Sequence, residues 1–345
     1  MQGFEICYAF AIFPLRGENI RRFFMKRTLS FVLVLCFVSG VAFAQKVMVI
    51  KAAHSMPTTY HYHDGMIKFA EEVAKRSNGT MKIEIYPAAQ LGEERVTMEQ
   101  CKIGAIPIVL TGISDSYAPR TGVFGLPFLF RDSDHANKVL NGPIGQEVYK
   151  DLEANNLRLL SVWENGFRQI SNSKRPINKV DDLVGLKIRT PESPVWIDTI
   201  KAFGAIPTPM PFAETATAII QGLVDGQENA ILHMLANKTY EIQKYIAIVN
   251  YMYGPAPLLA CKTWFDKLTA EQQKILLESA SIANTYMRSV AAKNEASALE
   301  IFKKAGNIIT TPSPDSFRAK VEPLYSTTFA EKYGMDLIDR IRNVK

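Results

Sequence analysis

The sequence predicts an α/β fold in which two similar lobes, each a mixed but largely parallel sheet flanked by helices, face each other across a cleft. Strand-like and helix-like patterns alternate between residues 47 and 110, which is typical of βαβ units. A helix–glycine–strand pattern occurs around Gly104 and again around Gly222. Residues 270–304 contain neither glycine nor proline, so an unbroken helix there would be about 50 Å long and would bridge both lobes.

The individual elements can be placed from their own residues. We expect, in chain order, a strand at 47–50, a helix at 62–73, a strand at 81–86, a helix at 93–103 and a strand at 106–110. Asn78-Gly79 ends the first helix, and Pro87 ends the second strand. The long helix should begin at Thr269, whose hydroxyl can cap it while Gln272 completes a capping box. A kink could still split that helix.

The amino-terminal part has the pattern of a secretory signal peptide. A short positive segment begins at Met25, an apolar run covers residues 28–41, and Ala42-Phe43-Ala44 is a small-x-small cleavage site. The apolar run is too short to span a membrane as a helix. We therefore expect residues 1–44 to be a leader, with translation starting at Met25.

Charge and cysteine content narrow the possible partners. The leader carries five Lys/Arg and two Asp/Glu, so its removal lowers the net charge from +6 to +3. Without a basic cluster or an RNA-binding motif, we expect no nucleic-acid partner. Only Cys101 and Cys261 remain after the leader, and either a disulfide or two buried free thiols would fit. No later apolar run reaches spanning length, so the mature protein should be soluble.

Two arginines are the strongest candidates for ligand binding. Arg168 ends Gly166-Phe167-Arg168, and Arg189 lies in Gly185-Leu186-Lys187-Ile188-Arg189-Thr190-Pro191, each where a strand should meet a loop. A guanidinium offers a planar fork of donors that matches a carboxylate. Two of them at one pocket would bind an organic acid. The alternative is that both pair with Asp or Glu on the surface.

Two further positions could complete such a pocket. Phe212 follows Pro209-Met210-Pro211 at an expected helix start, and Asn229 follows the expected strand around Gly226. They would add an aromatic face and a two-way hydrogen-bonding amide. Alternatively, Phe212 is a core residue and Asn229 caps a helix. We interpret Glu228 as a turn or inter-strand residue.

Histidines provide the best enzyme-like feature of the sequence. His54, His61 and His63 lie close together in the sequence, but their spacing is not a standard metal-binding pattern. We expect no metal and no cofactor, and allow a ligand-facing role for His54 alone. A secreted carboxylate-processing enzyme that uses this loop is the alternative function. His135 and His233 are expected to be surface residues.

Six motifs together resemble one family, the solute-binding proteins of tripartite ATP-independent periplasmic (TRAP) transporters, DctP type. They occur in the family's order, and they are Tyr86-Pro87-Ala88-Ala89-Gln90-Leu91-Gly92, Leu126-Pro127-Phe128-Leu129-Phe130, Glu164-Asn165-Gly166-Phe167-Arg168-Gln169, residues 185–191, Pro207-Thr208-Pro209-Met210-Pro211-Phe212 and Val224-Asp225-Gly226-Gln227-Glu228-Asn229.

The resemblance implies a two-lobed periplasmic-binding-protein fold that closes over an organic acid. It assigns Arg189 as the main carboxylate clamp, with Arg168, Asn229 and Phe212 as further contacts. Sialic-acid-binding members carry an acidic residue near the position of Gly112, and the sequence has none beside it, so we expect an amino-bearing ligand to bind poorly.

The resemblance also implies partners and a division into lobes. We expect a periplasmic monomer that delivers a dicarboxylate, sugar acid or hydroxy acid to the TRAP membrane permease. A sensor kinase as partner stays open. One lobe would comprise residues 45–165 plus 254–293, and the other residues 166–253 plus 294–345.

Overall fold

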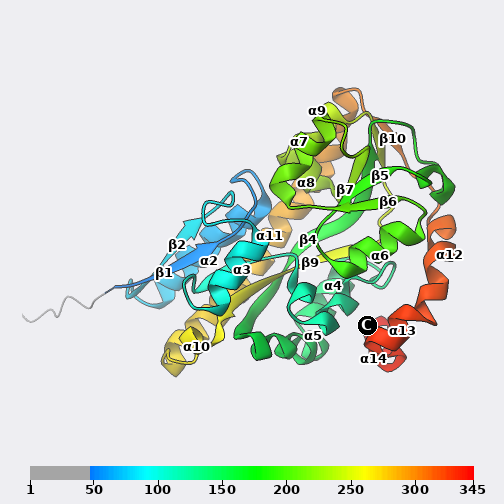
Figure 1. The fold of residues 1–345 in the computed structure, drawn as a ribbon. Helices are drawn as coiled ribbons and strands as arrows, with labels where there is room; N and C mark the ends of the chain where they lie inside the picture. Colours follow the sequence, from blue (N-terminus) through cyan, green and yellow to red (C-terminus); the bar gives the residue numbers. More distant parts are fainter. Residues whose placement is uncertain (1–46) are drawn as a thin grey trace, which may run out of the picture. The chain divides into compact units, whose positions relative to one another are not determined.

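A computed structural model of the chain describes residues 47–345 (Figure 1). The predicted leader at residues 1–44 and the proposed start at Met25 lie outside the described residues. Within the described part, no helix combines the length and the apolar character needed to cross a membrane. Cys101 and Cys261 are both buried and carry free thiols.

The described part of the chain contains ten strands and thirteen α-helices. The strands are β1 (Met48–Ala53), β2 (Met81–Tyr86), β3 (Ile108–Leu110), β4 (Leu157–Asn172), β5 (Lys187–Thr190), β6 (Ile206–Pro209), β7 (Gly226–Ala230), β8 (Tyr245–Ala247), β9 (Tyr253–Cys261) and β10 (Ile308–Thr310). The helices are α2 (His61–Arg76), α3 (Glu94–Lys102), α4 (Ser133–Leu140), α5 (Pro143–Tyr149), α6 (Pro194–Ala202), α7 (Thr215–Ile220), α8 (Ile231–Ala236), α9 (Thr239–Ile242), α10 (Lys262–Phe265), α11 (Ala270–Lys304), α12 (Pro314–Tyr325), α13 (Thr328–Tyr333) and α14 (Met335–Arg342).

The predicted α/β architecture with two lobes is confirmed, and one long strand connects them. The strand order is β2-β1-β3-β9-β4-β7-β5-β6, and β8 pairs with β4 and β10. Residues 157–167 of β4 pair with β9, whereas residues 168–172 pair with β7 and β8. The partner of β4 therefore changes at Arg168, in the middle of the strand. The predicted lobe boundaries, which include a break between residues 165 and 166, stay a prediction.

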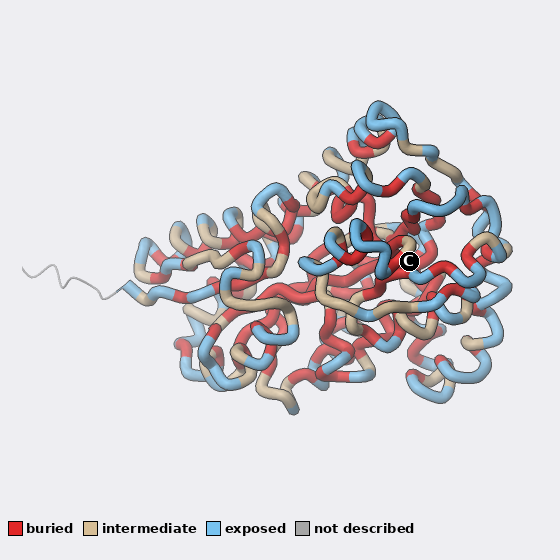
Figure 2. Tube along the Cα trace, turned by 45° about the horizontal axis from the view of Figure 1, so that its top comes forward, coloured by how far each residue is buried: buried red, intermediate tan, exposed pale blue. Residues whose placement is uncertain are grey.

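The sheet is mixed because of β4 and β9. Parallel pairs join β1 to β2 and β3, and β5 to β6 and β7, as the βαβ pattern predicted. Every pairing of β4 and β9 is antiparallel. All nine residues of β9 are buried, and buried residues follow the central strands through the molecule (Figure 2). Such continuous burial requires helices on both faces of the sheet.

The long helix α11 has the predicted bounds and no break. Its cap is also as predicted, since the Gln272 amide donates to the Thr269 hydroxyl at 3.2 Å and the Thr269 amide donates to the Gln272 side chain at 2.9 Å. The helix runs from α10 in one lobe to β10 in the other (Figure 1). It packs against α2, where a Cβ on Gly65 would lie only 3.0 Å from Met287 Cβ. Near its other end, the Phe302 ring stacks on Tyr240.

Candidate ligand-binding site

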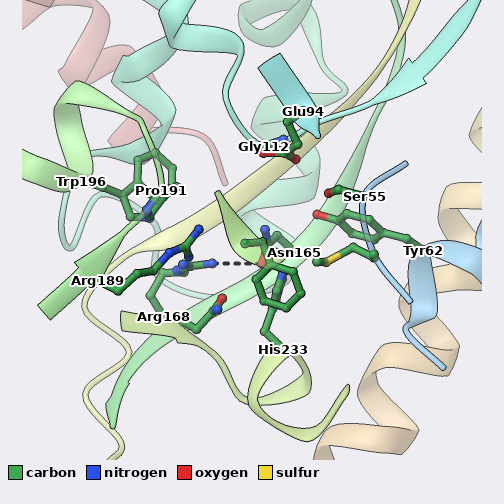
Figure 3. A pocket seen from close by; sticks show the side chains of 13 residues that line it. Ser55, Tyr62, Glu94, Gly112, Asn165, Arg168, Arg189, Pro191, Trp196 and His233 are labelled. Carbon is green, nitrogen blue, oxygen red and sulfur yellow. Dashed lines mark hydrogen bonds between the residues drawn. The ribbon is translucent and has the colours of Figure 1, made fainter. Parts of the chain in front are cut away.

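A cavity lies where residues of both lobes converge beside β4 (Figure 3). Its empty volume is about 430 Å³, part of which is open to solvent. The lining residues are Ser55, Met56, Tyr62, Glu94, Gly112, Asn165, Arg168, Arg189, Pro191, Trp196, Phe212, Asn229 and His233. A second hollow beside it shares Glu94, Arg189, Pro191 and Phe212 with the cavity. Four of the five residues predicted from the sequence are thus brought together, and His54 is not among them.

Arg189 is buried, and its hydrogen bonds leave part of its donor fork unused. Its Nε and Nη2 atoms donate to the Met210 carbonyl at 3.1 and 2.7 Å, and its Nη1 atom makes no hydrogen bond to residues 47–345. Arg189 is the penultimate residue of β5. No carboxylate of residues 47–345 forms an ion pair with it. Burial lowers the pKa of Arg189 to about 10, which leaves it cationic at neutral pH. The residue thus places a buried positive charge at the cavity without an opposing carboxylate in contact.

Arg168 occupies a different environment from the one predicted. It lies inside β4 rather than at a strand end, because β4 continues to Asn172. Its Nε and Nη2 atoms donate to both carboxylate oxygens of Glu228 at 2.7 and 2.6 Å. Burial lowers the pKa of Arg168, but Glu228, Tyr251 and Tyr60 together raise it by more, so the net pKa is raised. Arg168 therefore pairs with an acidic residue, as the alternative interpretation of the sequence stated, but the pair is buried rather than on the surface.

The Glu228 pair is part of a larger network. The Tyr251 hydroxyl donates to Glu228 Oε2 at 2.7 Å, and Arg168 Nη1 donates to Asn165 Oδ1 at 3.2 Å, the dashed line in Figure 3. Glu228 is fully buried on β7. Arg168 Nη2 also donates to the Glu228 backbone carbonyl at 3.1 Å. With four hydrogen bonds to Glu228 and Asn165, the Arg168 guanidinium is largely neutralised and held in place.

Asn229, Phe212 and His233 all line the cavity. Asn229 is the fourth residue of β7, so it is not the cap of α8, which is preceded directly by Ala230. Its Nδ2 atom donates to Gln227 Oε1 at 3.2 Å. The Phe212 ring packs edge-on against the His233 ring at 5.2 Å and lies 6.0 Å from the Arg189 guanidinium carbon. Phe212 is half-buried, which differs from a fully enclosed core residue.

Comparison with known proteins identifies the family. The model of bacterial extracellular solute-binding protein family 7, DctP, matches residues 52–332. The chain belongs to this family. The resemblance to TRAP solute-binding proteins that the sequence motifs indicated is therefore confirmed.

Three relatives illustrate what this family 7 protein is similar to. A TRAP periplasmic solute-binding protein from Polaromonas sp. JS666, solved with D-erythronate, is 38% identical with a TM-score of 0.84, over 86% of this chain and 99% of that one. The sugar-acid-binding protein DctPAm from Advenella mimigardefordensis, solved with galactonate, is 31% identical with a TM-score of 0.82, over 86% and 97%. The 2,3-diketo-L-gulonate-binding periplasmic protein YiaO of Escherichia coli K12 is 34% identical over 76% of this chain and 80% of its own.

The expectation that no acidic residue lies near Gly112 is wrong for this family 7 protein. The Gly112 amide donates to Glu94 Oε1 at 2.8 Å, and both residues line the cavity (Figure 3). Glu94 begins α3, eighteen positions earlier in the sequence, so its proximity to Gly112 arises from the fold. Burial raises the pKa of Glu94 to about 7, against the opposing effects of the Gly112 hydrogen bond and the nearby arginines. The reason given for excluding amino-bearing ligands therefore no longer applies.

The raised pKa of Glu94 predicts a pH-dependent effect of its replacement. Because the pKa is raised on folding, the protonated carboxyl favours the folded state below pH of about 4.5, and this contribution is lost as the pH rises through about 7. We expect Glu94→Gln to be about 1–3 kcal/mol more stable than the wild type at pH 8 and nearly equal at pH 4. Denaturant unfolding of the ligand-free protein at both pH values measures this. Glu71→Gln, on the exposed face of α2, is the control, and an equal difference at both pH values would contradict the prediction.

His135 and His233 were expected on the surface, but both are buried. His233 lines the cavity, and its Nδ1 atom lies 2.7 Å from the Tyr60 hydroxyl. Tyr60 precedes α2 in one lobe, and His233 belongs to α8 in the other. Burial and the charge of Arg168 lower the pKa of His233 well below its usual value, so the ring is neutral at neutral pH. No sequence pattern marks this position, because a lone histidine in a short helix has no characteristic spacing.

The three histidines of the alternative enzyme function do not converge on one point. His54 Nε2 lies 3.3 Å from His63 Nδ1, while His61 Nε2 lies 2.7 Å from the Glu164 carbonyl oxygen. Burial, helped by the charge on His63, lowers the pKa of His54 to about 3. Among residues 47–345, no group of three or more His, Cys, Asp and Glu side chains is arranged to hold a metal ion. Ser55 and Met56 of this loop line the cavity, whereas His54 does not.

Proposed function

We propose that this protein is the periplasmic receptor of a TRAP transporter and captures a small organic acid through the Arg189 guanidinium. The observation that carries the proposal is a buried cation, at a cavity, without a contacting carboxylate from the described chain. Leaving a charge buried and unpaired is costly, and a ligand carboxylate would relieve that cost. The relatives that bind erythronate, galactonate and 2,3-diketo-L-gulonate support an acid as ligand.

The cavity supports closure of the lobes around the ligand. Its walls come from both lobes, and strand β4 and helix α11 run from one lobe to the other (Figure 1). A ligand that contacts both walls binds the closed arrangement best and so shifts the balance towards it. The closed receptor would then deliver the acid to the membrane permease. The signal-peptide pattern supports a periplasmic location.

Calorimetry and mass spectrometry of the purified protein test the proposal. We expect D-erythronate, galactonate or another organic acid to bind with one site per chain, and neutral sugars to give no heat. Native mass spectrometry before denaturation, and analysis of the released ligand afterwards, should return the acid unchanged. A chemically altered acid would instead favour the carboxylate-processing enzyme. If saturating organic acids neither bind nor raise the melting temperature, the receptor proposal is wrong.

A further inference from the structure

The two walls of the cavity differ in chemistry. Arg168 and Arg189, from β4 and β5, lie on one side, and Ser55 and Tyr62 lie on the other (Figure 3). The arginine wall can hold an anion. The opposite wall contributes two hydroxyl groups and no cation. A ligand that spans the cavity therefore meets a charged group at one end and neutral hydrogen-bonding groups at the other.

Tyr62 stands out on the neutral wall. Tyr62 is only 2% exposed, yet its hydroxyl makes no hydrogen bond of ordinary geometry within the described chain, although the Asn165 side chain lies beside it. The hydroxyl is directed into the cavity (Figure 3). The hydroxyl of the neighbouring Tyr60, in contrast, has two hydrogen-bond partners, His233 Nδ1 at 2.7 Å and the Asn165 carbonyl at 3.2 Å. Buried hydroxyl groups nearly always have partners, so a partner for Tyr62 should come from the ligand.

The charges around the cavity indicate what kind of partner this is. Glu228 already occupies most of the Arg168 fork, so Arg189 alone offers a free cationic donor. His233 is held neutral by burial, and the Glu94 carboxyl lies on the cavity wall beside Gly112. A second ligand carboxylate would find no cation among the lining residues of the Tyr62 wall. A hydroxyl group, in contrast, could both donate and accept there.

We propose that Tyr62 is a specificity-determining residue that hydrogen-bonds a ligand hydroxyl, so that the site selects hydroxylated monocarboxylates over dicarboxylates and over acids without hydroxyls. This inference rests on the proposed function and adds the substrate class. When a ligand analogue lacks the group that pairs with a buried donor, the donor is left without a partner. Such an analogue is rejected more strongly than one that differs only slightly in size.

Matched ligands and matched variants test the role of Tyr62. The ligands are D-erythronate and galactonate, their counterparts without hydroxyls, butyrate and hexanoate, and the dicarboxylate succinate. The variant is Tyr62→Phe, which removes only the hydroxyl oxygen. The control is Tyr149→Phe, because Tyr149 is also fully buried with an unpartnered hydroxyl but does not line the cavity.

We expect the wild type to bind a hydroxylated acid at least tenfold more tightly than its counterpart without hydroxyls and more tightly than succinate. Tyr62→Phe should weaken binding of the hydroxylated acid by about three- to tenfold, the range for one neutral hydrogen bond, and should change butyrate or hexanoate binding by less than about twofold. Tyr149→Phe should change neither affinity. The melting temperature of ligand-free Tyr62→Phe should not fall, since the lost hydroxyl has no partner.

Other outcomes overturn the inference in distinguishable ways. Equal losses for hydroxylated and non-hydroxylated acids would make Tyr62 a structural residue, and no loss at all would remove it from the site. Tighter binding of succinate than of either hydroxylated acid would refute the monocarboxylate class while leaving the organic-acid receptor intact. If no acid binds to the wild type, the proposed function itself fails.

Discussion

Replacing Arg189 by alanine should weaken binding of the organic acid by about thirtyfold to more than a thousandfold. Truncating one partner of a buried, hydrogen-bonded charge pair typically costs about 2–5 kcal/mol, and Arg189 is the cation at this cavity that has no carboxylate contact of its own. Arg189→Lys should recover only part of the affinity, because an ammonium group lacks the planar fork. Isothermal titration calorimetry with the tightest acid of the panel measures both variants.

Arg189 should contribute little to the stability of the ligand-free protein. We expect Arg189→Met, which keeps an unbranched chain but removes the buried charge, to unfold at the same denaturant concentration as the wild type or at a higher one. Arg95→Ala is the affinity control, since Arg95 lies at the neighbouring hollow but is about half exposed and pairs with Glu192 at 3.5 Å. A loss of affinity in Arg95→Ala as large as in Arg189→Ala would point to a general charge effect instead of a clamp.

Local sequence patterns predicted the elements that form within short segments. The strand at 81–86 and the helix at 270–304 have their predicted bounds, because alternation, helical spacing and caps are encoded in neighbouring residues. The strand expected at 106–110 is shorter and begins at Ile108, after Pro107, which has no N–H group for a ladder. The length of β4 was missed because its two halves pair with different strands, and both pairings are distant in sequence.

The cavity residues also divide into those that local sequence motifs predicted and those that only the fold brings to the site. Arg189, Phe212 and Asn229 follow recognisable motifs, and all three line the cavity. Glu94 was missed because its contact with Gly112 depends on how α3 meets the loop after β3. His233 and Tyr62 were missed as site residues, since His233 was expected on the surface and Tyr62 is the first residue of the helix expected at 62–73. A polar atom without a partner becomes visible only when burial and neighbours are known.

Replacing Glu228 should have the opposite pattern of effects to replacing Arg189. Glu228 and Arg168 form a pair that is almost completely buried, with side chains 0% and 4% exposed. Removing one partner of such a pair leaves an uncompensated buried charge and typically costs about 3–5 kcal/mol. We therefore expect Glu228→Gln to lower the free energy of unfolding by roughly that amount, as measured by urea denaturation of the ligand-free protein.

A surface pair provides the control for Glu228→Gln. Glu278 and Arg76 are 2.7 Å apart, close to the distance in the buried pair, but their side chains are 45% and 34% exposed, so Glu278→Gln should cost at most about 1 kcal/mol. The double variant Arg168→Met/Glu228→Leu should recover part of the stability lost in Glu228→Gln, because it removes both charges together. If Glu228→Gln instead unfolds like the wild type while Arg168→Met abolishes binding of the acid and Arg189→Met does not, then Arg168 is the carboxylate clamp and the roles of the two arginines are exchanged.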